Sequence, residues 1–487
     1  MHMKLNLLAA RILCALIAAF ISLSASAYDF EADGIYYNIT STTDKTVSVT
    51  YKNDGVDNNY NDADTYSGEI SIPFSVNYKE TTYYVTAISD YAFSDCTSLT
   101  NISIHSEITE VGAYAFNGCS NLTACNIMSQ LQEIKPGTFD GCSSMRGMIL
   151  PDRLQTIGIS AFAGCSSLIT IGIPNNVSTI GTSAFENCKS LISVQLPENI
   201  SQLDTRTFYG CTSLESIEIP EGVSKIGDAT FMNCSNLGNI ILPTSVKYIS
   251  ASAFGYCTSL RAIELPDNLE SMGWGVFYGC STLESIEIPD NVITIGENFF
   301  QECTALSSVK LSNSLTTIPS CAFVSCENLK DITISDNVTN IEDYAFFDCK
   351  NLSSATIGNG IKNIGSQAFG YCNNLEIITI FAVEPPTAEE ITPGDNFSGT
   401  FQTWNYENTD LRVPAESIEK YRTAPVWENF FKDRNPLTAI EGVEAAEGAE
   451  SEVVARYDLS GRPVADDYRG MTIVRRADGS TAKEILR

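Results

Sequence analysis

The sequence predicts a β-rich repeat solenoid, a rod of short stacked coils that share a parallel β-sheet. A cysteine recurs every 23 residues, without insertion, in thirteen copies from Cys96 to Cys372. A phenylalanine lies three residues before each of these cysteines, from Phe93 to Phe369. Self-similarity at a fixed period of roughly 20 to 50 residues indicates a repeat architecture. One such unit cannot enclose a core, but stacked units bury their apolar residues in continuous rows.

Each coil is expected to contain one strand and a return segment. After Cys257, Ile263 and Leu265 lie two residues apart, so they share one face of a strand. Pro266 then ends the strand, because proline has no N–H for the ladder, and seven successive copies carry this proline. A second apolar pair and an Ala-Phe step return the chain through a short strand or a helical turn. With strands ~4.8 Å apart, the coils give a rod roughly 60 Å long.

The repeat reads Cys-x-x-Leu-x-x-Ile-x-Ile-Pro-x-x-Val-x-x-Ile-Gly-x-x-Ala-Phe over residues 68–381. It resembles the 23-residue leucine-rich repeat of BspA-like, or treponemal-type, bacterial surface proteins. The resemblance implies a right-handed solenoid with its parallel sheet on the concave side, and right-handed crossovers are also the general expectation. It further implies a non-enzymatic protein that acts in adhesion, with a host matrix protein or another cell-surface protein as partner.

Residues 1–27 are predicted to be a signal peptide. Lys4 and Arg11 give the positive start, residues 12–23 form an apolar run, and Ala-Ser-Ala at 25–27 is a cleavage site. The apolar run of about 12 residues is too short for a bilayer of about 30 Å. No later segment is long and apolar enough to cross a membrane. We therefore expect an exported protein, secreted or held at the cell surface, that does not span the membrane.

Both ends of the repeat array need caps, because an open end coil exposes its core. Residues 28–67 are predicted to form an N-terminal β cap, with two strands between Tyr36 and Tyr51. Nine extra residues around Lys79 indicate a hairpin inserted into the first coil. Residues 382–435 resemble the closing cap of the same family.

The last segments differ in composition from the repeats. Residues 436–452 are acidic and rich in Ala, Gly and Glu, which is typical of a linker. Residues 453–487 are predicted to be a small β module. Their Tyr-Asp-Leu-Ser-Gly-Arg at 457–462 and Gly-Met-Thr-Ile-Val at 470–474 resemble the C-terminal sorting domain of Bacteroidetes-type secreted proteins. That resemblance implies export through an outer membrane; an unrelated β tail is the alternative.

Charge and histidine content exclude several classes of function. The formal net charge of −30 argues against nucleic-acid binding, because nothing would attract a polyanion. Outside the leader the only histidine is His105, so the chain has too few histidines for a His-based zinc site and almost none for a serine triad. We predict neither cofactor nor metal. His105 is expected to be structural and unpartnered, and Asp57 to Asp62 a polar loop, since that segment lacks the Gly and Glu of a calcium loop.

The cysteine row suggests disulfides, because the protein is expected to be exported. Stacked cysteines would have parallel Cβ vectors, however, which is incompatible with disulfide torsion. We therefore expect buried, reduced thiols that act as small apolar fillers. Cys125 occupies a strand core slot, whereas Cys321 occupies a variable slot expected to be exposed. The row comprises Cys96, Cys119, Cys142, Cys165, Cys188, Cys211, Cys234, Cys257, Cys280, Cys303, Cys326, Cys349 and Cys372.

The outward strand position, seven residues after the cysteine, carries Glu218, Glu264, Glu287 and then Lys310. Stacking would place Glu264 and Glu287 roughly 5 Å apart. Three interpretations stay open: a solvated face, a site for a cationic partner, and a retaining glycosidase pair. The last also needs a shielded acid and a pocket, which an open sheet does not offer.

Four aromatic residues occupy slots that vary between copies: Trp274, Tyr256, Tyr278 and Tyr209. They are either binding anchors or residues that pack against the next coil. If they line a groove, a glycan becomes the favoured ligand. The overall expectation is a non-enzymatic recognition protein, with a glycan- or nutrient-binding protein, a structural envelope spacer and a surface enzyme as alternatives.

Overall fold

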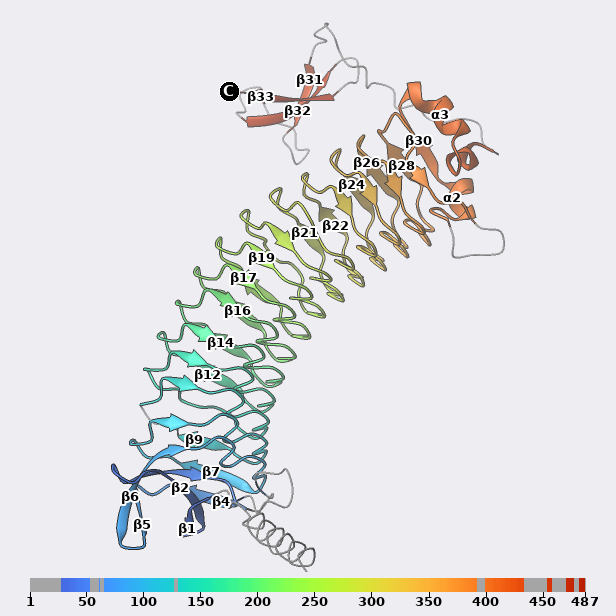
Figure 1. Ribbon diagram of the computed structural model, residues 1–487. Coiled ribbons are helices and arrows are strands. Elements are labelled where there is room, and N and C mark those ends of the chain that lie inside the picture. The colour runs from blue at the N-terminus through green and yellow to red at the C-terminus, as the bar shows by residue number, and fades with distance from the viewer. Residues whose placement is uncertain are drawn as a thin grey trace, which may run out of the picture.

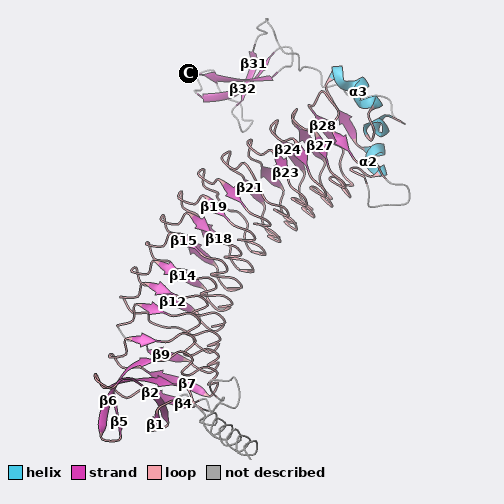
Figure 2. Ribbon diagram, viewed as in Figure 1, coloured by secondary structure: helices cyan, strands magenta, loops and turns pink. Residues whose placement is uncertain are grey.

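A computed structural model describes residues 28–52, 61, 65–126, 130–391 and 399–432, and three backbone strands within 453–486. The predicted leader, the predicted linker and Asp57–Tyr60 and Asp62 lie outside these residues. The chain forms a curved rod of stacked coils (Figure 1). Strands dominate, and among the described residues helices occur only near the C-terminal end of the rod (Figure 2). The predicted β-rich repeat solenoid is confirmed.

A single coil shows how the sequence sets local structure. Ile217 and Ile219 are buried, and Glu218 between them is exposed. This alternation forms β16 (Ser216–Glu218). After a proline turn the chain forms the two-residue strand β17 (Lys225–Ile226). The return segment is therefore a short strand followed by turns, not a helical turn.

The first strands of successive coils pair in parallel and form the first sheet. Equivalent residues lie side by side, as the pair Ile217 and Ile240 shows. The ladder is interrupted where residues 146–148 and 261–264 form no strand, and between β22 and β24, but Ile263 stays buried, so the predicted apolar row continues through its coil. The strands, in four segments, are β4 (Gly68–Ser71), β7 (Leu99–Ser103), β9 (Ala124–Asn126); β12 (Thr170–Gly172), β14 (Ser193–Gln195), β16, β18 (Asn239–Ile241); β21 (Ser285–Glu287), β22 (Ser308–Lys310); and β24 (Asp331–Ile334), β26 (Ser354–Ile357), β28 (Ile377–Ile380), β30 (Asp410–Arg412).

The two-residue strands form a second parallel sheet. Its ladder breaks between β8 and β10 and between β13 and β15. It is also interrupted at residues 294–295, next to Phe299, which is buried in a slot that most coils fill with alanine. The Phe299 ring lies edge-on to Phe300 at 4.6 Å, so the coil holds two rings where its neighbours hold one. The strands are β8 (Glu110–Val111), β10 (Glu133–Ile134), β11 (Thr156–Ile157), β13 (Thr179–Ile180), β15 (Gln202–Leu203), β17, β19 (Tyr248–Ile249), β20 (Ser271–Met272), β23 (Thr317–Ile318), β25 (Asn340–Ile341), β27 (Asn363–Ile364) and β29 (Thr387–Ala388).

The phenylalanine row forms one stack of rings along the core. From Phe93 to Phe369, ring centroids of neighbouring coils lie 5.0 to 5.7 Å apart. Tyr66 begins the stack at 4.5 Å from Phe93, and Phe401 ends it at 5.7 Å from Phe369. Both end rings come from the capping segments, so the caps continue the core as well as cover it.

Every coil turns through two residues with positive φ. They lie five residues and one residue before the cysteine, as Arg206 (57°) and Gly210 (70°) do before Cys211. Glycine, Asn and Asp tolerate this left-handed region, and β-branched residues do not. Neither slot holds a β-branched residue in any of the thirteen coils. The turn therefore imposes a sequence rule of its own on the repeat.

The N-terminal cap is a sheet in the order β1-β2-β3-β6-β5. Both predicted hairpins are present, as the antiparallel pairs β2–β3 and β5–β6. β3 pairs in parallel with β6, and β6 with β8, so this cap extends the second sheet. The strands are β1 (Phe30–Ala32), β2 (Ile35–Ser41), β3 (Thr46–Thr50), β5 (Ser75–Tyr78) and β6 (Thr81–Ile88).

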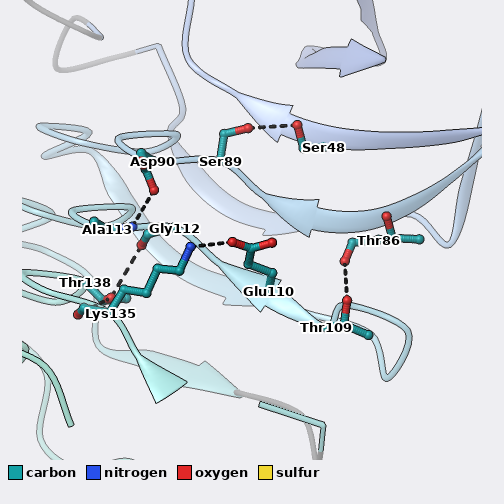
Figure 3. A network of polar contacts seen from close by, with 10 residues as sticks. All are labelled: Ser48, Thr86, Ser89, Asp90, Thr109, Glu110, Gly112, Ala113, Lys135 and Thr138. Atoms are coloured by element: carbon teal, nitrogen blue, oxygen red, sulfur yellow. Dashed lines mark hydrogen bonds and ion pairs between the residues drawn. The ribbon is translucent and has the colours of Figure 1, made fainter. Parts of the chain in front are cut away.

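Polar contacts join the cap to the first coils (Figure 3). Ser89 Oγ donates to Ser48 Oγ over 2.8 Å, which links β3 to the chain after β6. Asp90 Oδ1 accepts a hydrogen bond from the backbone N–H of Ala113, 2.7 Å away in the next coil. The same carboxylate contact recurs from Asp228 to Ala251 and from Asp343 to Ser366.

Asn61, the described member of the polar loop, is buried and holds the first coil. Its amide Nδ2 lies 3.1 to 3.3 Å from the carbonyl oxygens of Tyr91, Ala92 and Ser94. Its Oδ1 accepts from the backbone N–H of Lys52 at 3.1 Å. Its oxygen and amide group both serve the backbone, so Asn61 acts as a cap and not as a cation ligand.

The parallel sheets continue past residue 381, since β29 pairs with β27 and β30 with β28. Trp427 Nε1 donates to the carbonyl oxygen of Pro386 at 2.7 Å, and Tyr421 Oη to that of Ala382 at 3.0 Å. The helices at this end are α2 (Thr403–Asn408), η1 (Ala415–Ser417), α3 (Ile418–Thr423) and η2 (Trp427–Phe431). The predicted β module is a three-stranded antiparallel sheet of β31 (Val453–Tyr457), β32 (Gly470–Arg476) and β33 (Thr481–Leu486).

Candidate functional site: the outward face of the first sheet

The outward side chains of the first sheet, four and seven residues after each cysteine, form what we call the first-sheet face. Most coils place polar residues in these slots. Four coils instead place isoleucines there, and these side chains are 43 to 89% exposed. Ile192 and Ile169 are adjacent, since the N–H of one donates to the carbonyl of the other at 3.1 Å. Contiguous exposed apolar residues such as these two mark interaction sites. The four exposed isoleucines are Ile149, Ile169, Ile192 and Ile241.

Two exposed glycines increase the accessibility of Ile149. Gly172 lies beside it in the sheet, and Gly147 precedes it by two residues. Neither glycine has positive φ, and a Cβ at Gly172 would meet no atom within 4 Å. Packing therefore does not require glycine here. Its effect is to leave the flank of Ile149, 89% exposed, open to a partner.

An acidic groove of about 440 Å³ lies where β14, β16 and β18 end. Glu218 lies in register beside the exposed Ile241, so an apolar wall adjoins a carboxylate. Among the described residues, the groove's three carboxylates form no ion pair. The groove therefore suits a lysine or arginine, whose stem is apolar and whose head is cationic. Its lining is Val194, Gln195, Leu196, Glu198, Glu218, Ile219, Pro220, Glu221, Ile241, Leu242, Pro243 and Thr244.

The remaining predicted charges lie farther along the same face and behave differently. Glu287 pairs in register with Lys310, and the two form an ion pair whose hydrogen bond raises the pKa of Lys310. Arg261 and Glu284 form a second pair at 2.9 Å. Glu264 is exposed on the segment without a strand. The predicted row of outward charges therefore has two parts. The charge is neutralised around Glu287 and uncompensated around Glu218.

A glycosidase arrangement would need one of Glu264 and Glu287 to be shielded from water. Both carboxylates are exposed, and Glu287 is bound by Lys310. Neither carboxylate lines the acidic groove around Glu218. The face therefore lacks the enclosed acid that this chemistry requires.

The predicted aromatic residues form a cluster on the turns, away from the first-sheet face. The rings of Tyr256 and Tyr278 meet edge-on at 4.9 Å, and Trp274 lies 6.1 Å from Tyr278. A Cβ on Gly279 would lie 2.5 Å from the Tyr256 ring, so this tyrosine packs over the glycine of the next coil. Trp274 stays 44% exposed. Tyr256 therefore matches the packing interpretation, and Trp274 is the accessible ring.

Tyr209, in the same region of the repeat, packs against its own coil. The guanidinium of Arg206 lies 4.2 Å from the Tyr209 ring centroid and also pairs with Glu186 at 2.7 Å. This cation–π contact occupies the ring face that a ligand would use.

The thirteen cysteines of the row are all buried, and each has a free thiol. From the second copy on, every Sγ lies 3.0 to 3.2 Å from the carbonyl oxygen of the phenylalanine 26 residues earlier. Burial raises the pKa of Cys211 and of Cys280 to about 12. Such thiols are poor nucleophiles, because the thiolate is the reactive form.

Cys125 is buried in β9, whereas Cys321 is half-buried and not fully exposed as predicted. Burial raises the pKa of both thiols. The prediction that His105 is unpartnered is wrong. Its Nδ1 accepts from the N–H of Glu107 at 3.3 Å, and its ring meets Phe74 edge-on at 5.7 Å. The ring thus packs beside the inserted hairpin, and burial lowers its pKa.

The exposed isoleucines are the residues that the sequence interpretation missed. Their signal was present, because they occupy slots that are polar in most copies. Across the part of the chain that the structure describes, no group of three or more His, Cys, Asp or Glu is placed to hold a metal ion. None of the helices described is long and apolar enough to cross a bilayer.

Comparison with known proteins identifies the repeat. The family described as BspA type leucine rich repeat region matches residues 74–192, 155–284 and 270–384. A leucine-rich repeat protein from Bacteroides ovatus is 34% identical, with a TM-score of 0.64 over 72% of this chain and 94% of its own. A leucine rich cell surface protein from Faecalibacterium prausnitzii is 24% identical (TM-score 0.45; 72% and 94% covered), and the pneumococcal vaccine antigen PcpA 20% (0.45; 80% and 94%). No curated protein matches. The chain belongs to the BspA type leucine-rich repeat family.

Proposed function

We propose that this chain is an exported, non-enzymatic recognition protein that binds another protein through the first-sheet face, in adhesion at the cell surface. The carrying observation is that the first-sheet face exposes four isoleucines, and that one of them, Ile241, lines a groove with three uncompensated carboxylates. A rigid, preformed sheet binds at little ordering cost. Export rests on the leader predicted at residues 1–27, and attachment on the sorting domain that residues 453–487 resemble.

The partner is expected to present basic residues on an apolar surface. The uncompensated carboxylates attract it over a distance that salt screens, with a Debye length of about 8 Å at physiological ionic strength. The isoleucines then supply the apolar contact. Exposed Trp274 lies in a different part of the coil and is not needed for this interface.

The test is to bind the purified chain to an array of host matrix proteins and glycans at two salt concentrations. A protein ligand whose binding weakens with salt is expected. The double variant Ile149→Ser with Ile241→Ser should then lose at least ~10-fold in affinity, because truncating an interface anchor costs more than about 1 kcal/mol.

The matched control is Ile293→Ser. Ile293 is 59% exposed but lies after the first strand has ended, just before the interruption of the second sheet. It should leave binding unchanged. Equal losses in the two variants, or none in either, would assign binding to another surface.

A further inference from the structure

A second groove, of about 490 Å³, lies on the second sheet at the junction with the C-terminal end. It crosses β25, β27 and β29, which pair in parallel. Its volume falls within the range of roughly 300–1,000 Å³ typical of small-molecule sites. It shares no residue with the first-sheet face. The lining is Ser320, Asn340, Ile341, Glu342, Asp343, Asn363, Ile364, Gly365, Thr387, Ala388 and Glu389.

One wall of the groove is a polarised chain of hydrogen bonds. Thr387 Oγ1 donates to Asn363 Oδ1, and Asn363 Nδ2 donates to Asn340 Oδ1 at 2.7 Å. Asn340 Nδ2 in turn donates to Thr339 Oγ1 at 3.2 Å. Each amide group has two N–H donors, and these contacts use one on each. The oriented wall therefore keeps further N–H donors for a ligand.

The residues just after β25 and β29 supply carboxylate acceptors, two of them in fixed positions. Glu342 Oε2 accepts from the backbone N–H of Ser320 at 3.0 Å, and Asp343 Oδ1 from that of Ser366 at 2.8 Å. Each carboxylate holds one oxygen in the fold, and its second oxygen has further acceptor capacity. Glu389 adds an exposed carboxylate. The Cβ of any residue replacing Gly365 would lie 2.4 Å from Asp343 Oδ1, so this glycine makes room for the carboxylate.

We propose that this groove binds a neutral saccharide. A sugar hydroxyl both donates and accepts, so a polyol can use the amide donors and the carboxylate acceptors together. A basic peptide or a metal ion would use the carboxylates alone. Acidic ligands are excluded by charge, because the lining holds three carboxylates and no Lys or Arg. The site is independent of the protein-binding function proposed above.

The test titrates the full chain with neutral oligosaccharides (linear glucans, mannans, galactans and xylans), with a lysine-rich peptide and with calcium chloride. At least one oligosaccharide is expected to bind. Asn363→Ala should then weaken that binding at least tenfold, because it breaks the amide chain at its centre. Gln202→Ala is the matched control, since Gln202 begins the equivalent strand β15 in an earlier coil. It should leave binding unchanged.

Glu389→Gln tests the carboxylate acceptors of the groove. It provides an independent test if Asn363→Ala disturbs folding, which thermal unfolding of each variant would reveal. A lower affinity with an unchanged unfolding midpoint supports the site. Binding of the peptide or of calcium with no saccharide would overturn the proposal. So would saccharide binding that survives both groove variants and is lost in Trp274→Ala.

Discussion

The thiol of Cys119 lies 3.0 Å from the carbonyl oxygen of Phe93 in the preceding coil and donates a hydrogen bond to it. Eleven further cysteines repeat this contact, one coil at a time. The carbonyl belongs to the residue whose ring forms the core stack. Each of these cysteines thus fills a small space and donates a second hydrogen bond to a buried carbonyl that already accepts from a backbone N–H, two tasks that alanine and leucine cannot perform together.

The buried thiols are expected to make the folded protein less stable as the pH becomes alkaline. Burial raises the pKa of Cys211 to about 12 from its usual value near 9. The folded state keeps this proton at pH values where the unfolded chain loses it. The contribution of Cys211 is therefore fully present below pH 9 and is lost as pH rises toward 12. We expect Cys211→Ala to be less stable at pH 7 but to lose stability less steeply above pH 9, by about 1.4 kcal/mol per pH unit.

Chemical unfolding at pH 7, 9 and 10 measures both slopes. Other groups that titrate in this range are common to the two proteins, so the difference isolates one thiol. Parallel slopes would mean that Cys211 is not protonated preferentially in the folded state.

Thiol reactivity should follow burial. At pH 8, native protein treated with iodoacetamide is expected to be alkylated first at Cys321, the half-buried thiol. The thirteen cysteines of the row should react only after unfolding, because burial protects them and disfavours the thiolate. Peptide mass spectrometry with time resolves the order. Early alkylation of Cys211 or Cys280 would contradict it.

The left-handed turn slots predict a stability difference at a single position. Ser183 has φ of +57°, and its hydroxyl forms no hydrogen bond with the residues that the structure describes. We expect Ser183→Gly to stabilise the protein by about 1 kcal/mol, since glycine adopts this region without strain. Ser183→Val should destabilise it by more than that, because Val is β-branched. Thermal unfolding decides, with Ser178→Gly, outside the turn, as the control expected to destabilise.

The core could be predicted well from the sequence because thirteen copies carry apolar residues at the same positions. Ile217 and Ile219 face inward with Phe208, and a single deviant copy cannot obscure that pattern. The interruption at 294–295 was not predictable from the same rows, because it accompanies Phe299, an exception to its own slot. The apolar residues repeated in every copy predicted the fold, whereas a residue that departs from its slot, such as Phe299, accompanies a local change in structure.

The candidate sites were harder to predict, since they depend on contacts between different slots. Tyr256 packs over Gly279 in the next coil, a relationship that inspection of either slot alone does not reveal. Glu218 was grouped with Glu264 by charge, but its neighbour in the sheet is Ile241. The groove around Asn363 joins the last regular coils to β29, which lies beyond the regular repeat.

We expect the stability of the first coil to depend on the side-chain amide of Asn61. Asn61 is 6% exposed, and its Nδ2 serves three carbonyl oxygens of the first coil. Asn61→Ala leaves the Ala92 carbonyl buried without a donor, at a cost of about 1–3 kcal/mol, whereas the Tyr91 carbonyl still accepts from the N–H of Ser94 at 3.0 Å. Asn61→Asp removes the donor and adds a carboxylate beside the carbonyls, so it should be at least as damaging.

Because each coil contacts only its neighbours, the effect should be local. Hydrogen exchange is expected to rise in Asn61→Ala at Phe93 and Cys96 and to stay unchanged beyond the middle of the rod. Asn199→Ala is the control, since exposed Asn199 serves a single carbonyl, that of Asn175, at 2.8 Å. It should alter exchange only near its own coil and by less. Uniform acceleration along the rod in Asn61→Ala would instead show that the coils unfold as one unit, with the cap stabilising all of them.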